Sequence, residues 1–149
     1  MLQNIIETRP SKKNESKSPQ AMIFDKIRAV FNNTYQRILL INPVQFSFET
    51  LNIQIAKNRR YYAYPPYGLG LITANLKKYG YVVANLDLNF EILKFIYEEE
   101  DEHKIQSQLT SFWQQQLKTS IKRFKPDLVG LTCTFTMSHR MTLDIADRI

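Results

Sequence analysis

Residues 37–43 read RILLINP, and this stretch decides the fold. Four consecutive apolar residues, Ile38 to Ile41, are typical of a strand that is buried on both faces, as in a parallel sheet. Pro43 has no amide hydrogen with which to continue a strand ladder, so we expect the strand to end there. The folded unit is therefore expected to begin near Gln36, with this strand as its first element.

Two further strands and several helices follow in alternation. Residues 81–88 and 127–135 form the other two apolar strand candidates, and Pro126 separates the second of them from the helix before it. Helices are predicted at 68–79, 89–97, 104–124 and from Met137 onward, most clearly where apolar residues recur every three or four positions. Alternation of this kind requires crossover connections, so the sequence predicts a doubly wound α/β fold with a parallel sheet.

Three local expectations depend on this pattern. The helix over 68–79 is expected to bury Leu69, Ile72, Leu76 and Tyr79 as one stripe, and Gly80 should close it in a left-handed conformation. The stretch 44–67 shows no strong period and is expected to be a long loop, which inside a compact domain is more often functional than idle. The acidic run 98–102 is expected to be a solvated surface turn.

Composition restricts the environment and the partners of the chain. The net charge is +6, but residues 1–37 carry +4 of it, so most of the excess lies on a tail of the kind that is usually solvated. We therefore expect no nucleic-acid partner. No apolar run is long enough to span a bilayer, and the first ten residues do not form a secretory signal. With only one cysteine, Cys133, these features favour a cytoplasmic protein that binds no membrane.

The domain organisation follows from the same features. Residues 1–35 are expected to be a basic tail, disordered over 1–20, followed by a short helix, and residues 36–149 a Rossmann-like domain. A doubly wound sheet usually has five or six strands, whereas only three are present here. We therefore expect this domain to be incomplete and the chain to be a fragment.

No complete catalytic apparatus is visible. Cys133 has no base placed near it by the sequence, and His103 and His139 are most simply surface residues. The segment GLGLIT at 68–73 is a poor match to the dinucleotide fingerprint, because Gly68 lies twenty-five residues beyond Pro43 rather than directly after the strand. CxxC, HExxH and P-loop motifs are absent, so no catalytic or metal-binding residue is assigned.

Ligand contacts are expected at the carboxyl ends of the strands, where open α/β sheets bind their ligands. Gly68 and Gly70 at a helix start either let a bulky ligand approach the backbone or let helix and sheet pack closely. Three threonines at the end of the third strand share one face if the strand is regular; they either bind a polar ligand or reflect ordinary strand propensity. These threonines are Thr132, Thr134 and Thr136.

Three segments together resemble one family: RILLINP (37–43), YPPYGLGLITANLKKYGYVVANLDLN (64–89) and KPDLVGLTCTFT (125–136). They are similar to the amino-terminal cobalamin-binding domain of cobalamin-dependent radical S-adenosylmethionine enzymes. The resemblance implies a Rossmann-like, flavodoxin-like fold that holds the corrin ring and buries its nucleotide tail between helix and sheet. The implied cofactor-binding residues are Asn42, Pro43, Tyr67, Gly68, Leu69, Thr132, Thr134, Phe135 and Thr136.

The sequence also departs from the family pattern. The DxHxxG loop is absent, so no histidine ligand to cobalt can be named. The fourth strand and the radical barrel, whose CxxxCxxC motif would hold a [4Fe–4S] cluster and S-adenosylmethionine, are missing. The resemblance therefore implies a truncated methyltransferase-like protein that is not catalytic alone and that has cobalamin and the remainder of the enzyme as partners. A Rossmann-like nucleotide-binding domain and a non-catalytic module that docks a partner chain stay open as alternatives.

Overall fold

The computed structural model describes residues 18, 19, 22, 23, 25, 26 and 35–149. The chain divides into two compact units, Met1–Thr34 and Tyr35–Ile149. In the first unit the described residues 19, 22, 23, 25 and 26 are helical, in agreement with a short helix there. The disorder expected for residues 1–17 and 20, and the rest of the predicted helix up to residue 34, lie outside the described residues.

The second unit contains a three-stranded, all-parallel sheet. Its strands are β1 (Arg37–Asn42), β2 (Val82–Asp87) and β3 (Leu128–Leu131), in the order β2-β1-β3. In the central strand, residues 38 to 41 are between 0 and 6% exposed. A parallel strand with neighbours on both edges and helices over both faces must be apolar throughout, which is why RILLIN forms it. The predicted α/β fold with a parallel, Rossmann-like sheet is confirmed.

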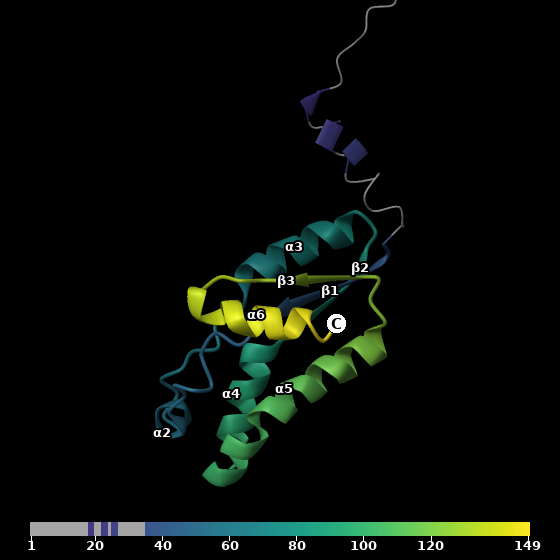
Figure 1. Ribbon diagram of the computed structural model, residues 1–149. Coiled ribbons are helices and arrows are strands. Elements are labelled where there is room, and N and C mark those ends of the chain that lie inside the picture. Colours follow the sequence, from purple (N-terminus) through teal and green to yellow (C-terminus); the bar gives the residue numbers. More distant parts are fainter. Residues whose placement is uncertain (1–17, 20–21, 24, 27–34) are drawn as a thin grey trace, which may run out of the picture. The chain divides into compact units, whose positions relative to one another are not determined.

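Helices cover both faces of this sheet (Figure 1). Within residues 35–149, one face carries only α3 (Tyr67–Lys78), while α4 (Leu88–Glu98), α5 (Glu102–Phe124) and α6 (His139–Ala146) pack on the other. A short helix, α2 (Ile53–Lys57), lies in the loop after β1, and a 3-10 turn, Thr136–Ser138, precedes α6. None of the helices in the described part of the chain is both long enough and apolar enough to cross a membrane.

The two faces have hydrophobic cores of very different size. The larger core joins Leu39 and Ile41 of β1 to the buried faces of α4 and α5 and to Ile145 of α6. Phe95 of α4 and Phe112 of α5 are partly buried against this core and stack on each other, with ring centroids 4.5 Å apart. The core under α3 contains only Ile38, Leu40, Leu69 and Val83 as buried members. Each fully buried aliphatic side chain contributes about 1.5–3 kcal/mol, so the stability of the domain comes mainly from the α4/α5 side.

The single helix on its face explains an error in the predicted stripe of α3. Leu69 and Thr73 are the buried residues, whereas Ile72 is 49% and Tyr79 77% exposed. No other helix of residues 35–149 packs beside α3, so α3 contacts the sheet along a narrow line and the side chains on its flanks remain exposed. Gly80 has φ +88° and closes the helix as predicted, and the amide of Tyr81 donates to the Leu76 carbonyl at 3.1 Å.

Two further expectations are corrected by the structure. The loop over 44–67 contains α2, whose start is capped by the Asn52 side chain, which accepts from the Ile55 amide at 2.9 Å. The third strand ends at Leu131 and does not reach Phe135. Its last paired residue, Leu131, lies opposite Ile41, and the last backbone hydrogen bond to β1 runs from the Thr132 amide to the Ile41 carbonyl at 3.1 Å. The threonines beyond residue 132 therefore do not share a strand face.

The acidic run 98–102, which was expected to be a solvated surface turn, also stabilises the connection between α4 and α5. Asp101 caps α5 by accepting from the amides of His103 and Lys104, at 2.9 and 3.3 Å. Glu99 pairs with Lys104, and the hydrogen bond from that ammonium group lowers the pKa of the Glu99 carboxyl. These contacts allow two long helices to be joined by a very short connection.

At the opposite end of α5, Arg37 and Asp127 connect three elements. The Arg37 guanidinium lies 4.5 Å from the Phe124 ring centroid and donates from Nε to the Phe124 carbonyl at 2.8 Å, where the helix dipole is negative. The Asp127 carboxylate accepts from the amides of Gln36 and Arg37, both at 2.9 Å. These two backbone hydrogen bonds lower the pKa of Asp127.

Because the folded pKa of Asp127 is lowered, this group stabilises the fold above its unfolded pKa, and the contribution is lost as the pH falls through the folded value. We expect Asp127→Asn to lower the urea midpoint at neutral pH and to reduce the loss of stability between about pH 4 and pH 2. Urea unfolding at several pH values measures this. Asp144→Asn is the control, since that carboxylate has no hydrogen bond or ion pair within the described residues. Parallel pH profiles for wild type and Asp127→Asn would contradict the assignment.

Gly130 in β3 is required by the packing of Leu40. A Cβ atom at Gly130 would lie 2.9 Å from Leu40 Cδ2, and Leu40 is 6% exposed. We expect Gly130→Ala to destabilise the domain by about 1–3 kcal/mol, and by less in a Leu40→Ala background, as measured by urea unfolding. Gly70→Ala in α3 is the control, because a Cβ there meets nothing within 4 Å and should stabilise by about 0.5–1 kcal/mol. Equal losses at Gly130 in both backgrounds would refute the packing argument.

Candidate functional site

Asn42 ties together the carboxyl ends of the three strands. Its side chain is buried, with 2% of the residue exposed. The Nδ2 group donates to Asp87 Oδ1 at the end of β2, at 2.9 Å, and Oδ1 accepts from the Thr132 hydroxyl just beyond β3, at 3.3 Å. A buried amide with both of its ends satisfied holds the strand tips in register, since leaving either end unpaired would cost free energy.

A second buried amide holds the long loop over these tips. Asn89, at the start of α4, is 1% exposed; its Oδ1 accepts from the Gln45 amide at 3.1 Å, and its Nδ2 donates to the Tyr62 carbonyl at 3.4 Å. The beginning and the end of the loop after β1 are thus attached to one side chain. Arg59, with φ +56°, lies over the Tyr97 ring at 5.9 Å and holds the middle of the loop against α4.

These contacts leave a cavity of about 360 Å³ between the start of α3 and the ends of β1 and β3. Its walls carry amide, hydroxyl, phenol and apolar groups and no charged side chain. The lining residues are Asn42, Gln45, Tyr64, Pro65, Pro66, Tyr67, Gly68, Leu69, Ile72, Thr132, Thr134 and Phe135. We call this the tip cavity.

The start of α3 provides hydrogen-bond donors at the tip cavity. Pro66 is the N-cap residue, and no side chain caps the helix. The first backbone hydrogen bond of the helix runs from the Gly70 amide to the Pro66 carbonyl, at 3.1 Å. The preceding amides, those of Tyr67, Gly68 and Leu69, belong to the first turn, whose donors have no partner within a helix. Together with the positive end of the helix dipole they suit a phosphate or another anionic oxygen.

The two glycines of α3 lie on opposite flanks of the helix. Leu69 between them points to the sheet and is buried; Gly68 borders the tip cavity, and Gly70 borders a different cavity on the β2 side. A Cβ at either position meets nothing within 4 Å. Close packing of helix and sheet therefore does not explain these glycines, and both leave the flanks of α3 open to a ligand.

Seven of the nine residues expected to contact a cofactor line the tip cavity: Asn42, Tyr67, Gly68, Leu69, Thr132, Thr134 and Phe135. The other two are not among its lining residues. Pro43 is fully buried beneath the strand end, and Thr136 lies in the 3-10 turn with an exposed side chain. Their expected contacts remain predictions that the cavity does not support.

Sequence reasoning missed several residues that shape the site. Gln45, Pro65 and Ile72 line the tip cavity, and Asn89 positions the loop. The proline pair before α3 was a usable signal, because chain leading into a helix start borders whatever that start contacts. The role of Asn89 had no signal in the sequence, since its partners lie 44 and 27 positions away.

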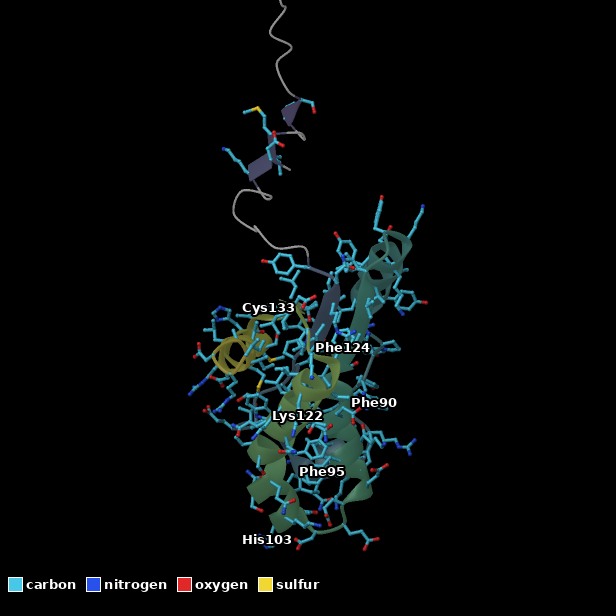
Figure 2. The ribbon with its side chains drawn as sticks, turned by 90° about the vertical axis from the view of Figure 1, so that its right-hand side faces the viewer. Phe90, Phe95, His103, Lys122, Phe124 and Cys133 are labelled. Atoms are coloured by element: carbon cyan, nitrogen blue, oxygen red, sulfur yellow. The ribbon has the colours of Figure 1, made fainter. Side chains whose placement is uncertain are left out.

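The candidate nucleophile and bases are far apart or exposed. Cys133 is exposed, its thiol lying 3.9 Å from the Phe135 carbonyl. Figure 2 shows His103 at the lower end of α5, far from Cys133, and His139 is exposed at the first turn of α6. In the described part of the chain no group of three or more His, Cys, Asp or Glu side chains could hold a metal ion.

Comparison with known proteins does not identify the chain. No protein-family model matches the sequence, and neither a curated protein nor a solved structure matches it significantly. The function of the chain must therefore be inferred from the geometry of its strand tips.

The bridging role of Asn42 can be tested with an apolar side chain of similar shape. We expect Asn42→Leu to destabilise the domain by about 1–3 kcal/mol, because it leaves the Asp87 carboxylate and the Thr132 hydroxyl without this partner. Asn75→Leu on the exposed face of α3 is the matched control, with an expected change within about 0.5 kcal/mol. Urea unfolding measures both, and equal effects would show that the strand tips do not depend on Asn42.

Proposed function

We propose that residues 35–149 form a cobalamin-binding domain of the kind found in cobalamin-dependent radical S-adenosylmethionine enzymes. The observation that carries the proposal is the meeting, around one cavity at the strand tips, of seven residues from three distant segments. They are seven of the nine residues for which the resemblance implied cofactor contact. The sheet order β2-β1-β3 supports it further, because a ligand at this edge lies against the carboxyl end of the central strand.

The cavity suits one part of cobalamin better than the whole. At about 360 Å³ it lies at the lower end of ligand-pocket volumes, which are roughly 300–1,000 Å³. The nucleotide tail would enter it, with its phosphate facing the first amides of α3 and its base against Leu69 and Ile72. The corrin ring would remain outside, on the strand ends.

An aromatic rim borders the place where the corrin would lie. Tyr64, Tyr67 and Phe135 line the cavity and are all substantially exposed, and Tyr62 stacks on Tyr64 with centroids 5.3 Å apart. Exposed rings around a polar cavity suit a large flat ligand, because they bury apolar area when it binds. In such an enzyme the cobalt would carry a methyl group, while this domain binds and orients the cofactor. S-adenosylmethionine and the [4Fe–4S] cluster would belong to a separate radical domain.

A nucleotide without a corrin is the second candidate, because the uncapped start of α3 would receive any phosphate. The two candidates differ in what must bind outside the cavity. A nucleotide requires only the tip cavity, whereas cobalamin also requires the strand ends and the aromatic rim.

The test uses hydroxocobalamin and dicyanocobinamide, which has the corrin but no nucleotide tail. Purified full-length chain is mixed with each, passed over a desalting column and examined for retained corrin absorbance, and affinities are obtained by spectral titration. We expect hydroxocobalamin to be retained and to bind at least about tenfold more tightly than the cobinamide, since only cobalamin can fill the cavity.

A matched pair of variants locates the binding. Gly68→Leu places a side chain in the tip cavity and should weaken hydroxocobalamin binding by about tenfold or more. Gly70→Leu, two residues along on the other flank, should leave it unchanged. No retained pigment with the wild-type chain would refute cobalamin binding, and retention that Gly68→Leu does not weaken would refute the site.

A further inference from the structure

A second cavity lies on the other flank of α3, over the end of β2. It has a volume of about 530 Å³ and shares with the tip cavity only the wall made by Pro65, Pro66 and Tyr67. Gly70 and Leu71 of α3 form one side, and Asn85, Asp87 and Glu91 form the other. We call it the β2-side cavity. Apart from Tyr67 in that shared wall, neither the resemblance nor the proposed function uses the residues of this cavity.

The acceptors of this cavity are held in place by the fold. Asp87 Oδ1 accepts from Asn42 Nδ2 at 2.9 Å and from the Phe90 amide at 3.1 Å, so the carboxylate is fixed from two directions. Its Oδ2 has no hydrogen bond within the described residues. Glu91, one helical turn further along, is half-buried and has no ion pair or hydrogen bond among the described residues.

One donor complements these acceptors. Asn85 Oδ1 accepts from the Thr73 hydroxyl at 3.0 Å, which orients the amide and leaves its Nδ2 without a partner in the described part of the chain. No Lys, Arg or His lines the cavity. A ligand that fits must therefore bring hydrogen-bond donors to two carboxylates, and a phosphate is disfavoured by like charge.

The remaining walls suit a planar ring. Pro65, Pro66, Tyr67 and Leu71 are apolar or aromatic, and Gly70 leaves the backbone open. Asp87 is the last residue of β2, and β2 follows α3, whose first turns contain Gly68 and Gly70. In dinucleotide-binding folds a carboxylate at this position accepts hydrogen bonds from ribose hydroxyls, because both hydroxyls of a vicinal diol can reach one carboxylate.

We propose that the β2-side cavity binds a neutral ribonucleoside, with Asp87 accepting from the ribose diol and the ring lying against the proline and tyrosine wall. This proposal is independent of cobalamin binding. The nucleotide of cobalamin cannot supply the ligand, since the ribose 3′-oxygen there is esterified and no vicinal diol remains.

The first experiment compares three ligands on the full-length wild-type chain by isothermal titration calorimetry. The probes are adenosine, 2′-deoxyadenosine and adenosine 5′-monophosphate. We expect adenosine to bind, 2′-deoxyadenosine to bind about tenfold or more weakly because a hydrogen bond to a charged group is lost, and the monophosphate to bind more weakly than adenosine. No binding of adenosine at millimolar concentration, equal affinity for the two nucleosides, or tighter binding of the monophosphate would each overturn the proposal.

The second experiment exchanges the roles of the two glycine variants. Gly70→Leu should weaken adenosine binding by about tenfold or more, because its side chain enters the β2-side cavity, while Gly68→Leu should leave adenosine binding unchanged. Thermal unfolding checks that both variants fold. If adenosine binds Gly70→Leu as it binds wild type, the β2-side cavity is not the site. In the cobalamin titrations the expectation is reversed, since Gly68→Leu should weaken binding and Gly70→Leu should not. Each proposal can therefore fail while the other is still tested.

Discussion

The strand tips depend on one buried amide. Asn42 connects Asp87 at the end of β2 with Thr132 beyond β3, so the three parallel strands end as one unit. Parallel strands have no hairpin to align them, and their connections here are long, so register at this edge must come from side chains and from the hydrophobic pattern. Both cavities are built on this edge, and their shapes therefore depend on this bridge.

The unequal cover of the sheet explains where the openings lie. On the α4/α5 side, Trp113, Leu117 and Ile145 belong to a continuous core, and the cavities on that side lie at its margin, one between α5 and residues 147–149 and one along β3. On the other side a single helix contacts the sheet along Leu69 and Thr73 and leaves both of its flanks open. A helix packed in this way separates two cavities, and the small side chains at 68 and 70 keep both accessible. The tip cavity and the β2-side cavity therefore both lie beside α3.

Asp87 belongs to both halves of this arrangement. Its Oδ1 accepts from Asn42 and caps α4, and the residue also lines the β2-side cavity. The tip cavity is lined by Asn42 itself. A ligand that hydrogen-bonds to Asp87 Oδ2 would contact a carboxylate that is already hydrogen-bonded to Asn42, a residue lining the tip cavity. The two proposed sites are therefore physically connected through the pair Asp87–Asn42, although each is argued from its own residues.

The sequence alone determined the strands, their parallel arrangement, the long apolar face of α5 and the left-handed closure at Gly80, because these follow from local periodicity and backbone preference. It also pointed to most residues around the tip cavity, since parallel strand ends and a helix start must meet at one edge. Only the tertiary structure decided that β3 stops at Leu131, opposite Ile41 of β1, and that Ile72 is exposed, because no other helix of residues 35–149 packs beside α3. The bridges of Asn42 and Asn89 join residues up to 90 positions apart, and no local pattern carries such information.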